Sequence, residues 1–595
     1  MQISTLLALG RKIVRSSVLL TFIVFLCGLA FRIYRYDLYP LQFDQIQILT
    51  HAAQIRMGDL NFVGPRTGPV EMFTGPFVYY LTAFLSFFIS TPWTVVGMAV
   101  VLYILTFWVI RSLFVFYRID KRISFFFLLF YAVSLYQVTL DRIPWNPNLM
   151  MLASTLVFVP MRQIISHKNV RILDAIFLAL GVFIGYQAHF SGLFLILFVL
   201  CIGFLPVRNK KYAILAGVLG SVTTLFPTFI FDLKHQWLNL HGVMDVLKNN
   251  HGTVPTKEFF LLPFIRDIFV SLENIGKFLI PQTEQYLAIA AGIIVVLWTI
   301  QYARHHKNRE TAWFPLLWFC SINLLFFPYK GPKPEYYFLI QFPAILWMVA
   351  TMLSHIRIPV SKLLFAIVLS FSTIHFIGLV STLNSQKELM IGSQVEASKV
   401  VREKLRENPD LHVAIDIQTL NRAGLNYLLK DVPEVRTQDE TLNVVHLIYP
   451  ANDRTPTTKR FGSLVYWEDP RRNSQEKYLL VDNVVIGSPP SLELFRDEYP
   501  SKEFDMASSQ YVIFREGEKV GRLLLLVDDI DNIRRKDFLK QFEEEWGETV
   551  SDWQPVDYKG GKVYLQAKKK TVFLLQLLTD DEASKKDSFQ LKLYP

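Results

Sequence analysis

The chain has 595 residues, of which 52% are hydrophobic, 14% aromatic and only 19% charged. Average soluble proteins carry about a quarter charged residues, so this balance argues against a disordered, fibrous or nucleic-acid-binding protein despite the net charge of +10. Residues 1–384 hold 30 Lys and Arg against 15 Asp and Glu, whereas residues 385–595 hold 31 against 36. We therefore expect an apolar, basic first part and a mixed, slightly acidic second part.

The first part is a series of twelve apolar runs separated by short basic loops. A helix needs about 20 apolar residues to cross a membrane, and several runs are shorter, so tilted or re-entrant segments are expected among them. The first run is interpreted as a retained anchor, because no small-residue cleavage site follows it. The runs are 16–33, 76–90, 93–116, 123–140, 148–165, 172–187, 190–205, 212–230, 285–301, 312–328, 336–353 and 360–380.

Clusters of Lys and Arg between the runs predict which loops stay in the cytoplasm. Twelve complete crossings would put both chain ends on one side, yet basic residues place the start inside and the tail outside. One run is therefore predicted not to cross, and the candidates are 76–90 and the broken pair 172–205. The segments predicted to lie outside are 141–147, 186–191, 232–284, 329–335 and the tail from 385.

An external loop, residues 34–75, follows the first run and contains an amphipathic stretch that ends at Met57. The apolar positions of this stretch suit a helix lying on the membrane surface. Asp44 stands at its head, and the residues alone allow two interpretations. The carboxylate either caps the helix or acts as a general base at the boundary between water and lipid.

From about residue 385 the pattern changes to that of a soluble α/β domain. Strands are expected at 411–417, 444–449, 478–481, 511–514 and 521–527, and helices at 421–429 and 537–546. The three cysteines, Cys27, Cys201 and Cys320, all lie in apolar runs, so the tail is not disulfide-linked and no metal-binding spacing is present. The sequence predicts a polytopic helical membrane protein with about 11–13 transmembrane helices. Residues 385–595 are expected to form one extracytoplasmic α/β domain.

Several short motifs occur in order along residues 16–380. The motifs are Phe43-Asp44, Gly58-Asp59-Leu60, Gly64-Pro65-Arg66-Thr67, Gly75-Pro76 with Tyr79-Tyr80-Leu81, Pro-Trp-Asn-Pro-Asn at 144–148, Gly-Tyr-Gln-Ala-His-Phe-Ser at 185–191, Phe-Asp-Leu-Lys-His at 231–235 and Glu-Tyr-Tyr-Phe at 335–338. This order resembles that of bacterial membrane glycosyltransferases of the GT-C superfamily. The group with the strongest resemblance contains the protein O-mannosyltransferases and the lipid A aminoarabinose transferase, in glycosyltransferase family 39 and its relatives.

The resemblance implies a plasma (inner) membrane enzyme of the cell envelope that uses a polyprenyl-phosphate-linked sugar on the extracytoplasmic side. It places the acidic residue of the first external loop at Asp44. Most relatives have a second acid directly after it, and this chain has Gln45 instead, so a paired-carboxylate metal site is not indicated. The expected partners are the lipid-linked donor, membrane lipids and a glycan, lipid or protein acceptor, and no nucleic acid.

Two sets of residues are candidates for holding such a donor and its acceptor. Cations near the outer face would neutralise a lipid phosphate as it leaves the sugar, and they are Arg66, Arg142, Lys234, Lys330 and Lys333. The candidates for contact with the substrates are Gln45, Glu71, Tyr79, Tyr80, Asn146, His189, His235 and Tyr336. Interfacial snorkelling, an aromatic belt and turn formation are the alternative explanations for single members of both sets.

Two other functions stay open at this level. The first is a transporter or flippase of a lipid-linked saccharide, although the internally repeated halves that are common in transporters are not evident in this sequence. The second is a catalytically inactive assembly subunit, an interpretation that Gln45 keeps open.

Overall fold

The structure, a computed structural model, divides the chain into two compact units. The first comprises residues 1–386 and 390–392, and the second comprises 387–389 and 393–595. The structure describes residues 17–66, 72–249, 262–280, 284–327, 329, 333–356, 358–385, 390–407, 411–417 and 419–432, and after these the strands β2 to β13 whose bounds are given below. The predicted helix at 537–546 lies outside the described residues.

The first unit is helical, because each apolar run forms a helix that pairs its own backbone groups. Each of the twelve predicted runs lies on at least one helix. The elements are α2 (Ser17–Ile33), η1 (Tyr36–Leu38), α3 (Phe43–Arg56), α4 (Phe77–Leu85), α5 (Thr94–Phe116), α6 (Lys121–Val133), α7 (Leu135–Asp141), η2 (Asn146–Asn148), α8 (Leu149–His167), α9 (Ile172–Ala188), η3 (Phe190–Gly192), α10 (Leu193–Cys201), η4 (Ile202–Phe204), α11 (Lys210–Lys234), α12 (Leu238–Asn249), α13 (Leu262–Leu279), α14 (Gln285–His305), α15 (Arg309–Phe326), η5 (Glu335–Gln341), α16 (Phe342–Ser354) and α17 (Ile358–Ser385).

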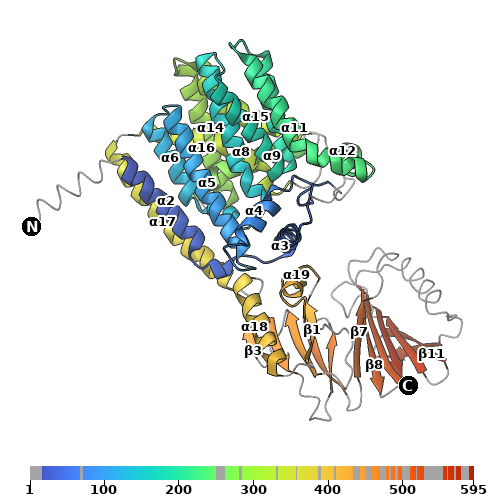
Figure 1. Cartoon of the computed structure of the whole chain (residues 1–595). Helices are drawn as coiled ribbons and strands as arrows, with labels where there is room; N and C mark the ends of the chain where they lie inside the picture. Colours follow the sequence, from blue (N-terminus) through green and yellow to red (C-terminus); the bar gives the residue numbers. More distant parts are fainter. Residues whose placement is uncertain are drawn as a thin grey trace, which may run out of the picture. The chain divides into compact units, whose positions relative to one another are not determined.

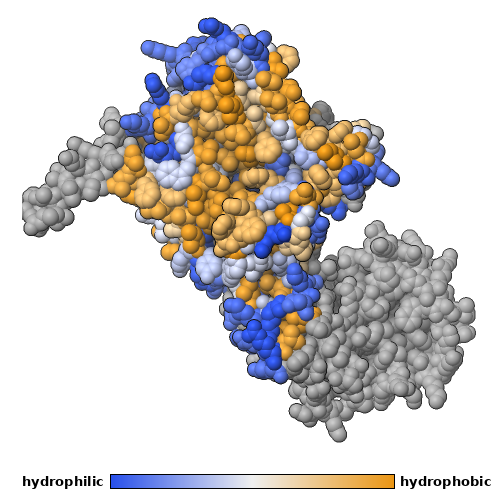
Figure 2. All heavy atoms as spheres, viewed as in Figure 1, coloured by the Kyte–Doolittle hydropathy of each residue, from blue (hydrophilic) through white to orange (hydrophobic). Residues whose placement is uncertain are grey.

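Six helical segments of the described chain are long and apolar enough to cross a membrane, and the bent pair α6–α7 makes a seventh if it is counted as one span. Three further apolar segments, Val18–Ile33, Ile172–Ala188 and Phe190–Phe204, are shorter. Figure 2 shows hydrophobic side chains over the visible face of the helical unit, with hydrophilic residues gathered at one end. The unit is therefore a multi-pass membrane fold, with fewer segments of full length than the 11–13 spans expected.

The core of the helical unit lies around α8 and α16, whose residues are mostly buried by the surrounding helices. α8 packs against α9 and α16 against α6, and Figure 1 shows these helices inside the bundle. At its edge, α2 and α17 lie side by side, and Phe31 stacks on Phe376 with ring centroids 4.6 Å apart. Helix α4 has only 9 residues, a rise of about 14 Å, so it is too short to cross a membrane alone.

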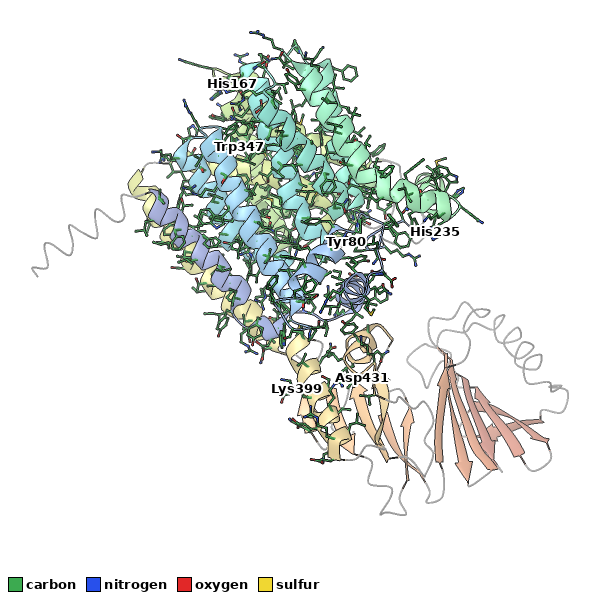
Figure 3. The ribbon with its side chains drawn as sticks, in the orientation of Figure 1. Tyr80, His167, His235, Trp347, Lys399 and Asp431 are labelled. Carbon is green, nitrogen blue, oxygen red and sulfur yellow. The ribbon has the colours of Figure 1, made fainter. Side chains whose placement is uncertain are left out.

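The loops of the helical unit separate into two groups at opposite ends. Lys168 pairs with Glu310, and the Arg122 guanidinium donates to the carbonyl of Ile356. The residues around Asn169 pair with those around Arg208. The predicted cytoplasmic loops therefore meet one another, and we call their meeting place the basic end: residues 111–122, 162–174, 208–211 and 304–310. The opposite end carries the loops predicted to lie outside, and Figure 3 shows Tyr80 and His235 there and His167 at the basic end.

The segment 232–284, which is predicted to lie outside, contains two helices that the apolar runs did not predict, α12 and α13. α13 packs along α14, and its polar positions interrupt the apolar run that a span would show.

In the second unit, β1 (Leu411–Ile417) and β2 (Asn443–Tyr449) are parallel and are joined through α19 (Thr419–Leu428). They belong to a sheet of order β1-β2-β4-β3, with β3 Lys459–Phe461 and β4 Leu464–Glu468. β5 (Lys477–Val481) and β6 (Val484–Ser488) form a hairpin. The observed strands β1, β2, β5, β8 and β9 confirm the five expected strands, with ends at or up to two residues beyond the expected bounds. The expected strands were 411–417, 444–449, 478–481, 511–514 and 521–527.

A seven-stranded sheet of order β10-β11-β12-β13-β9-β8-β7 contains the remaining described strands. Neighbouring strands in this sheet are antiparallel throughout. The bounds are β7 Glu493–Glu498, β8 Ser509–Glu516, β9 Lys519–Val527, β10 Gln554–Tyr558, β11 Gly561–Lys568, β12 Thr571–Leu577 and β13 Phe589–Tyr594.

Candidate functional site

Asp44 lies in the first turn of α3, two residues after the residue that caps the helix. The N-cap position is held by Gln42, whose N–H donates to the Oε1 of Gln45 at 3.1 Å. The interpretation of Asp44 as the capping residue is therefore wrong, because Gln42 and Gln45 close the helix end together. The carboxylate of Asp44 is therefore not needed to cap the helix. It lies at the N-terminal end of α3, where the helix dipole favours a negative charge.

The surroundings of Asp44 are aromatic and partly dry. The residue is exposed at the protein surface, yet neighbouring atoms desolvate the carboxylate and raise its pKa above the ordinary 3.8. Burial, with a smaller contribution from the charge of Asp44, also raises the pKa of the Tyr79 hydroxyl. Asp44 acts electrostatically on the hydroxyl of Tyr336 as well. A carboxylate from α3 thus faces a tyrosine from α4 and another from η5.

Tyr336 links this carboxylate to two more segments. Its ring lies 4.6 Å from that of Trp145, which precedes η2, and 5.5 Å from that of His189, between α9 and η3. The Trp145 indole N–H donates to Asn148 at 2.8 Å, which fixes the ring at the head of α8. Five separate segments therefore contribute to one cluster, which we call the Asp44 cluster: Asp44, Tyr79, Trp145, His189 and Tyr336.

His189 is buried and is neutral in this cluster. Its Nδ1 lies 3.0 Å from the Ser191 hydroxyl and also accepts the Ser191 N–H. Desolvation lowers the pKa of His189 to about 3, so the ring carries no charge at neutral pH. It can therefore contribute shape and a neutral hydrogen bond, and it does not add a positive charge for a phosphate.

A second group of polar atoms lies where α3 meets α4. The rings of His51 and Tyr79 stack at 4.5 Å, and Tyr80 donates from its hydroxyl to the carbonyl of Asn61 at 3.1 Å. The His51 ring interacts with the side chains of Gln54 and Asn61, whereas the Tyr79 hydroxyl has no hydrogen-bond partner among the described residues. Buried polar atoms are rarely left in this state, so this side of the Asp44 cluster has unused hydrogen-bonding capacity.

The loop between α3 and α4 is held by Asn239, which the sequence did not single out, and by Tyr186 and Asp232, which lie in the motifs at 185–191 and 231–235. The Phe73 N–H donates to Asn239 at 2.6 Å, and the Phe73 carbonyl accepts from the Tyr186 hydroxyl at 3.2 Å. Asn239 is fixed in turn by Asp232, which accepts from both its backbone N–H and its side-chain amide. Since these partners lie more than a hundred residues away from the loop, no local pattern could show these contacts.

Gln187 positions the start of α4 in the same way. Its Oε1 accepts the Phe77 N–H at 3.0 Å, and its Nε2 donates to Thr224 at 3.1 Å. A Cβ at Gly75 would come within 2.4 Å of the Gln187 amide atoms, so a larger residue there would displace the Gln187 amide from Phe77 and Thr224. The Gly-Pro motif at 75–76 is thus explained by packing.

Two of the five predicted phosphate ligands are already bound to protein groups. The Arg142 guanidinium donates to the carbonyls of Phe31, Tyr34 and Arg35 at 2.9–3.2 Å, and the buried Lys333 ammonium pairs with Asp267. These contacts anchor both side chains inside the protein, although the Arg142 Nε has no partner among the described residues. Their role as phosphate ligands stays a prediction.

The other predicted residues have the following positions. Lys234 is exposed at the end of α11, with its ammonium 5.8 Å from the centre of the Phe62 ring. Arg66 is exposed and pairs with Phe73 through the backbone. Asn146 donates to the Ala188 carbonyl, and His235 stacks on Phe231 outside the Asp44 cluster. Glu71 and Lys330 lie outside the described residues.

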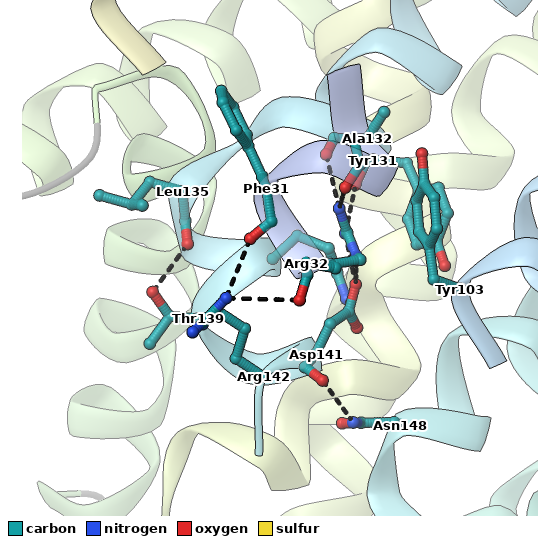
Figure 4. A network of polar contacts seen from close by, with 12 residues as sticks. Phe31, Arg32, Tyr103, Tyr131, Ala132, Leu135, Thr139, Asp141, Arg142 and Asn148 are labelled. Carbon is teal, nitrogen blue, oxygen red and sulfur yellow. Dashed lines mark hydrogen bonds and ion pairs between the residues drawn. The ribbon is translucent and has the colours of Figure 1, made fainter. Parts of the chain in front are cut away.

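A buried ion pair supports the loop that carries Trp145 (Figure 4). The Arg32 guanidinium, from α2, pairs with Asp141 at the end of α7 and donates to the carbonyls of Gly28, Tyr131 and Ala132. It also lies 3.9 Å over the Tyr103 ring. The helix bends by 54° between α6 and α7. Arg32 donates hydrogen bonds to carbonyls next to this break, and it thereby fixes the segment that leads to Trp145.

Gln45 has a structural role that a carboxylate cannot fill. Its Oε1 accepts from Gln42, while its Nε2 donates to the carbonyl of Pro144 at 3.3 Å in a buried position. Among the described residues, no group of three His, Cys, Asp or Glu side chains is placed to hold a metal ion.

We expect Gln45→Glu to lower stability by about 1–3 kcal/mol, because a buried carboxylate oxygen would face the Pro144 carbonyl with no donor between them. Thermal unfolding of the purified protein measures this effect. Gln47→Glu, two residues further along α3, is the matched control and should change the midpoint little. An unchanged midpoint in Gln45→Glu would show that the contact with Pro144 is unimportant.

No family model matches this chain, and no curated protein matches it. Among solved structures, it is similar to the crystal structure of ArnT from Cupriavidus metallidurans bound to undecaprenyl phosphate, with 14% identity and a TM-score of 0.46 over 72% of this chain and 85% of that one. The apo structure of the same protein gives 13% identity and a TM-score of 0.45 over 72% and 86%.

Proposed function

We propose that this protein transfers a sugar from a polyprenyl-phosphate donor to an acceptor hydroxyl at the membrane surface. The observation that carries the proposal is the convergence of five segments on Asp44, at the end of the helical unit opposite the basic end. By the positive-inside rule the basic end is cytoplasmic, which puts the Asp44 cluster on the extracytoplasmic side.

Asp44 acts in this proposal as the general base. It takes the proton of the acceptor hydroxyl as the oxygen attacks the anomeric carbon, and the bond from that carbon to the phosphate oxygen breaks on the opposite face. The electron pair leaves with the lipid phosphate, so the anomeric centre inverts and no covalent enzyme intermediate forms. Desolvation supports this role, because a carboxylate with a raised pKa is a stronger base toward a hydroxyl.

The remaining residues of the site bind and orient the substrates. Lys234 and Arg66 are the described cations of the predicted set that are exposed near this end, and a phosphate on the carrier lipid is the group that they would neutralise. The rings of Trp145 and Tyr336 offer apolar faces to a sugar. The prenyl chain would lie against the apolar surface of the helices.

The assay uses membranes that contain the full-length protein, a radiolabelled sugar on polyprenyl phosphate, and the cell's own acceptors. Release of polyprenyl phosphate together with labelled acceptor is the expected result. A transporter would instead move the intact donor across the bilayer of proteoliposomes with no cleavage of the sugar–phosphate bond. Absence of both activities would favour the inactive assembly subunit.

The rate of transfer is expected to depend on pH through Asp44. Because desolvation raises its pKa above 3.8, protonation removes the base at a higher pH than it would for an exposed Asp. The value of kcat/KM should therefore fall as the pH drops through that raised pKa and stay level above it. Initial rates between pH 4 and 8 measure this limb, with thermal unfolding at each pH as the control. A rate that is constant down to the lowest pH would contradict Asp44 as the base.

A further inference from the structure

The basic end of the helical unit has a large excess of positive charge. Its segments, 111–122, 162–174, 208–211 and 304–310, contain 13 Lys and Arg and 3 Asp and Glu. The three acids are engaged: Asp120 accepts the N–H groups of residues 122 and 123, Asp174 pairs with Arg171, and Glu310 pairs with Lys168. The field at this end therefore attracts anions.

One of these cations, Arg162, lies within the bundle. It is on α8, five residues before the helix ends, and its guanidinium carbon lies 4.3 Å over the buried ring of Trp347 on α16. The guanidinium also interacts electrostatically with the hydroxyl of Tyr302 on α14. Figure 3 shows Trp347 on the side of the unit that carries His167. Three helices thus surround this one charge.

Arg162 is not neutralised by the described part of the protein. No carboxylate pairs with it among the described residues, and its Nε has no hydrogen-bond acceptor there. Residues 357–362, which follow the end of α16 and whose side chains are outside the described set, contain Arg357 and Lys362 and no acid. The side chain is only half-buried, so its outer edge is accessible. A desolvated cation in this state has strong unused binding capacity for an anion.

The wall beside Arg162 is aromatic and well ordered by mutual contacts. Tyr302 stacks on Trp298 with centroids 5.3 Å apart, and His355 packs edge-on against Tyr302 at 5.0 Å. Rings of this kind are common at the depth of lipid headgroups, where one side meets lipid and the other meets water. These rings are the basis for placing the guanidinium at the depth of the lipid headgroups, where lipid phosphates are the most abundant anions.

We propose that Arg162, with Trp347 beneath it and Tyr302 beside it, binds the phosphate of an anionic lipid at the basic end. The planar guanidinium suits two phosphate oxygens at once, while the ring of Trp347 holds it in place. The site is independent of the Asp44 cluster and of the sugar donor. It would make the fold more stable in a membrane rich in phosphatidylglycerol or cardiolipin than in a neutral one.

The test uses the full-length protein in detergent, with thermal unfolding and native mass spectrometry as readouts. Phosphatidylglycerol should raise the unfolding midpoint of the wild type and appear as a bound lipid, whereas phosphatidylcholine and inorganic phosphate alone should do neither. Arg162→Gln should weaken phosphatidylglycerol binding by about ten- to hundredfold, the loss expected for one charged hydrogen-bonding group. Arg304→Gln removes one exposed charge from the same end and should keep the full effect.

Other outcomes would overturn the proposal. An equal loss in Arg304→Gln would mean that the lipid responds to overall charge and not to Arg162. A full stabilisation by inorganic phosphate would identify a free anion as the ligand. If Arg162→Gln does not fold, Arg162→Lys keeps the charge without the planar fork. It should bind phosphatidylglycerol more weakly than the wild type, and wild-type affinity would contradict the proposed geometry.

Discussion

Replacing Asp44 with asparagine is expected to lower the rate of sugar transfer by about 10²–10⁴-fold, the usual contribution of a general base. Asparagine keeps the size and polarity of the side chain but cannot accept the hydroxyl proton. Because Gln42 and Gln45 close the start of α3, the change should leave the helix and the unfolding midpoint almost unaffected. Initial rates with saturating donor measure the loss in kcat.

The matched control for this prediction is Asp59→Asn. Asp59 is exposed and lies just after α3, in the same external loop region 34–75 as Asp44. The control therefore removes one negative charge without changing a residue of the Asp44 cluster. Its rate should stay within about threefold of the wild type, the effect of a modest change in surface charge. Full activity in Asp44→Asn would show that another group takes the proton, or that no base is needed.

Removing Arg32 is expected to have the largest effect on stability. Arg32→Met leaves Asp141 charged and buried and also removes the donors from three carbonyls, so we expect a loss of about 3–5 kcal/mol or a failure to accumulate. Asp141→Asn should cost less, because an amide oxygen still accepts from Arg32. Thermal unfolding and the yield of folded protein in membranes measure this order.

Arg35→Met is the control for the Arg32 prediction. Arg35 pairs with Asp37 while both side chains are more than a third exposed, and such pairs are worth about 0–1 kcal/mol. A similar loss in Arg35→Met and Arg32→Met would mean that burial of the pair is unimportant. If Asp141→Asn lowered the stability more than Arg32→Met, the carbonyls next to the helix break would need no donor.

The apolar runs could be located from the sequence because a membrane helix must hide its backbone along its whole length. The break at Ser134 could not, since residues 123–140 contain no charged residue, Pro or Gly to mark a bend. The carbonyls at this break are paired by Arg32, about 100 residues earlier in the chain. α12 and α13 could not be predicted for a different reason. Their apolar residues are mixed with charged ones and form no continuous run.

Only some residues of the candidate site could be predicted from the sequence. Asp44 stands out because a lone acid precedes an amphipathic stretch, and the Tyr-Tyr pair at 336–337 stands out in a polar loop. Arg142 and Lys333 are predicted to bind phosphate because a sequence shows which residues are positively charged but not which groups they contact. Their acceptors, the carbonyls of residues 31–35 and Asp267, come from other segments.

The pairing of Arg32 with Asp141 sets an order for biosynthesis. Arg32 leaves the ribosome 109 residues before its counter-ion, so α2 enters the membrane while its cation has no partner. The residue is next to the last of the helix, where a long side chain can reach the interface and keep its charge hydrated. Arg32 can be drawn into the interior only when the bent pair α6–α7 arrives with both its carboxylate and its free carbonyls. α2 therefore reaches its final position only after α6 and α7 have been synthesised.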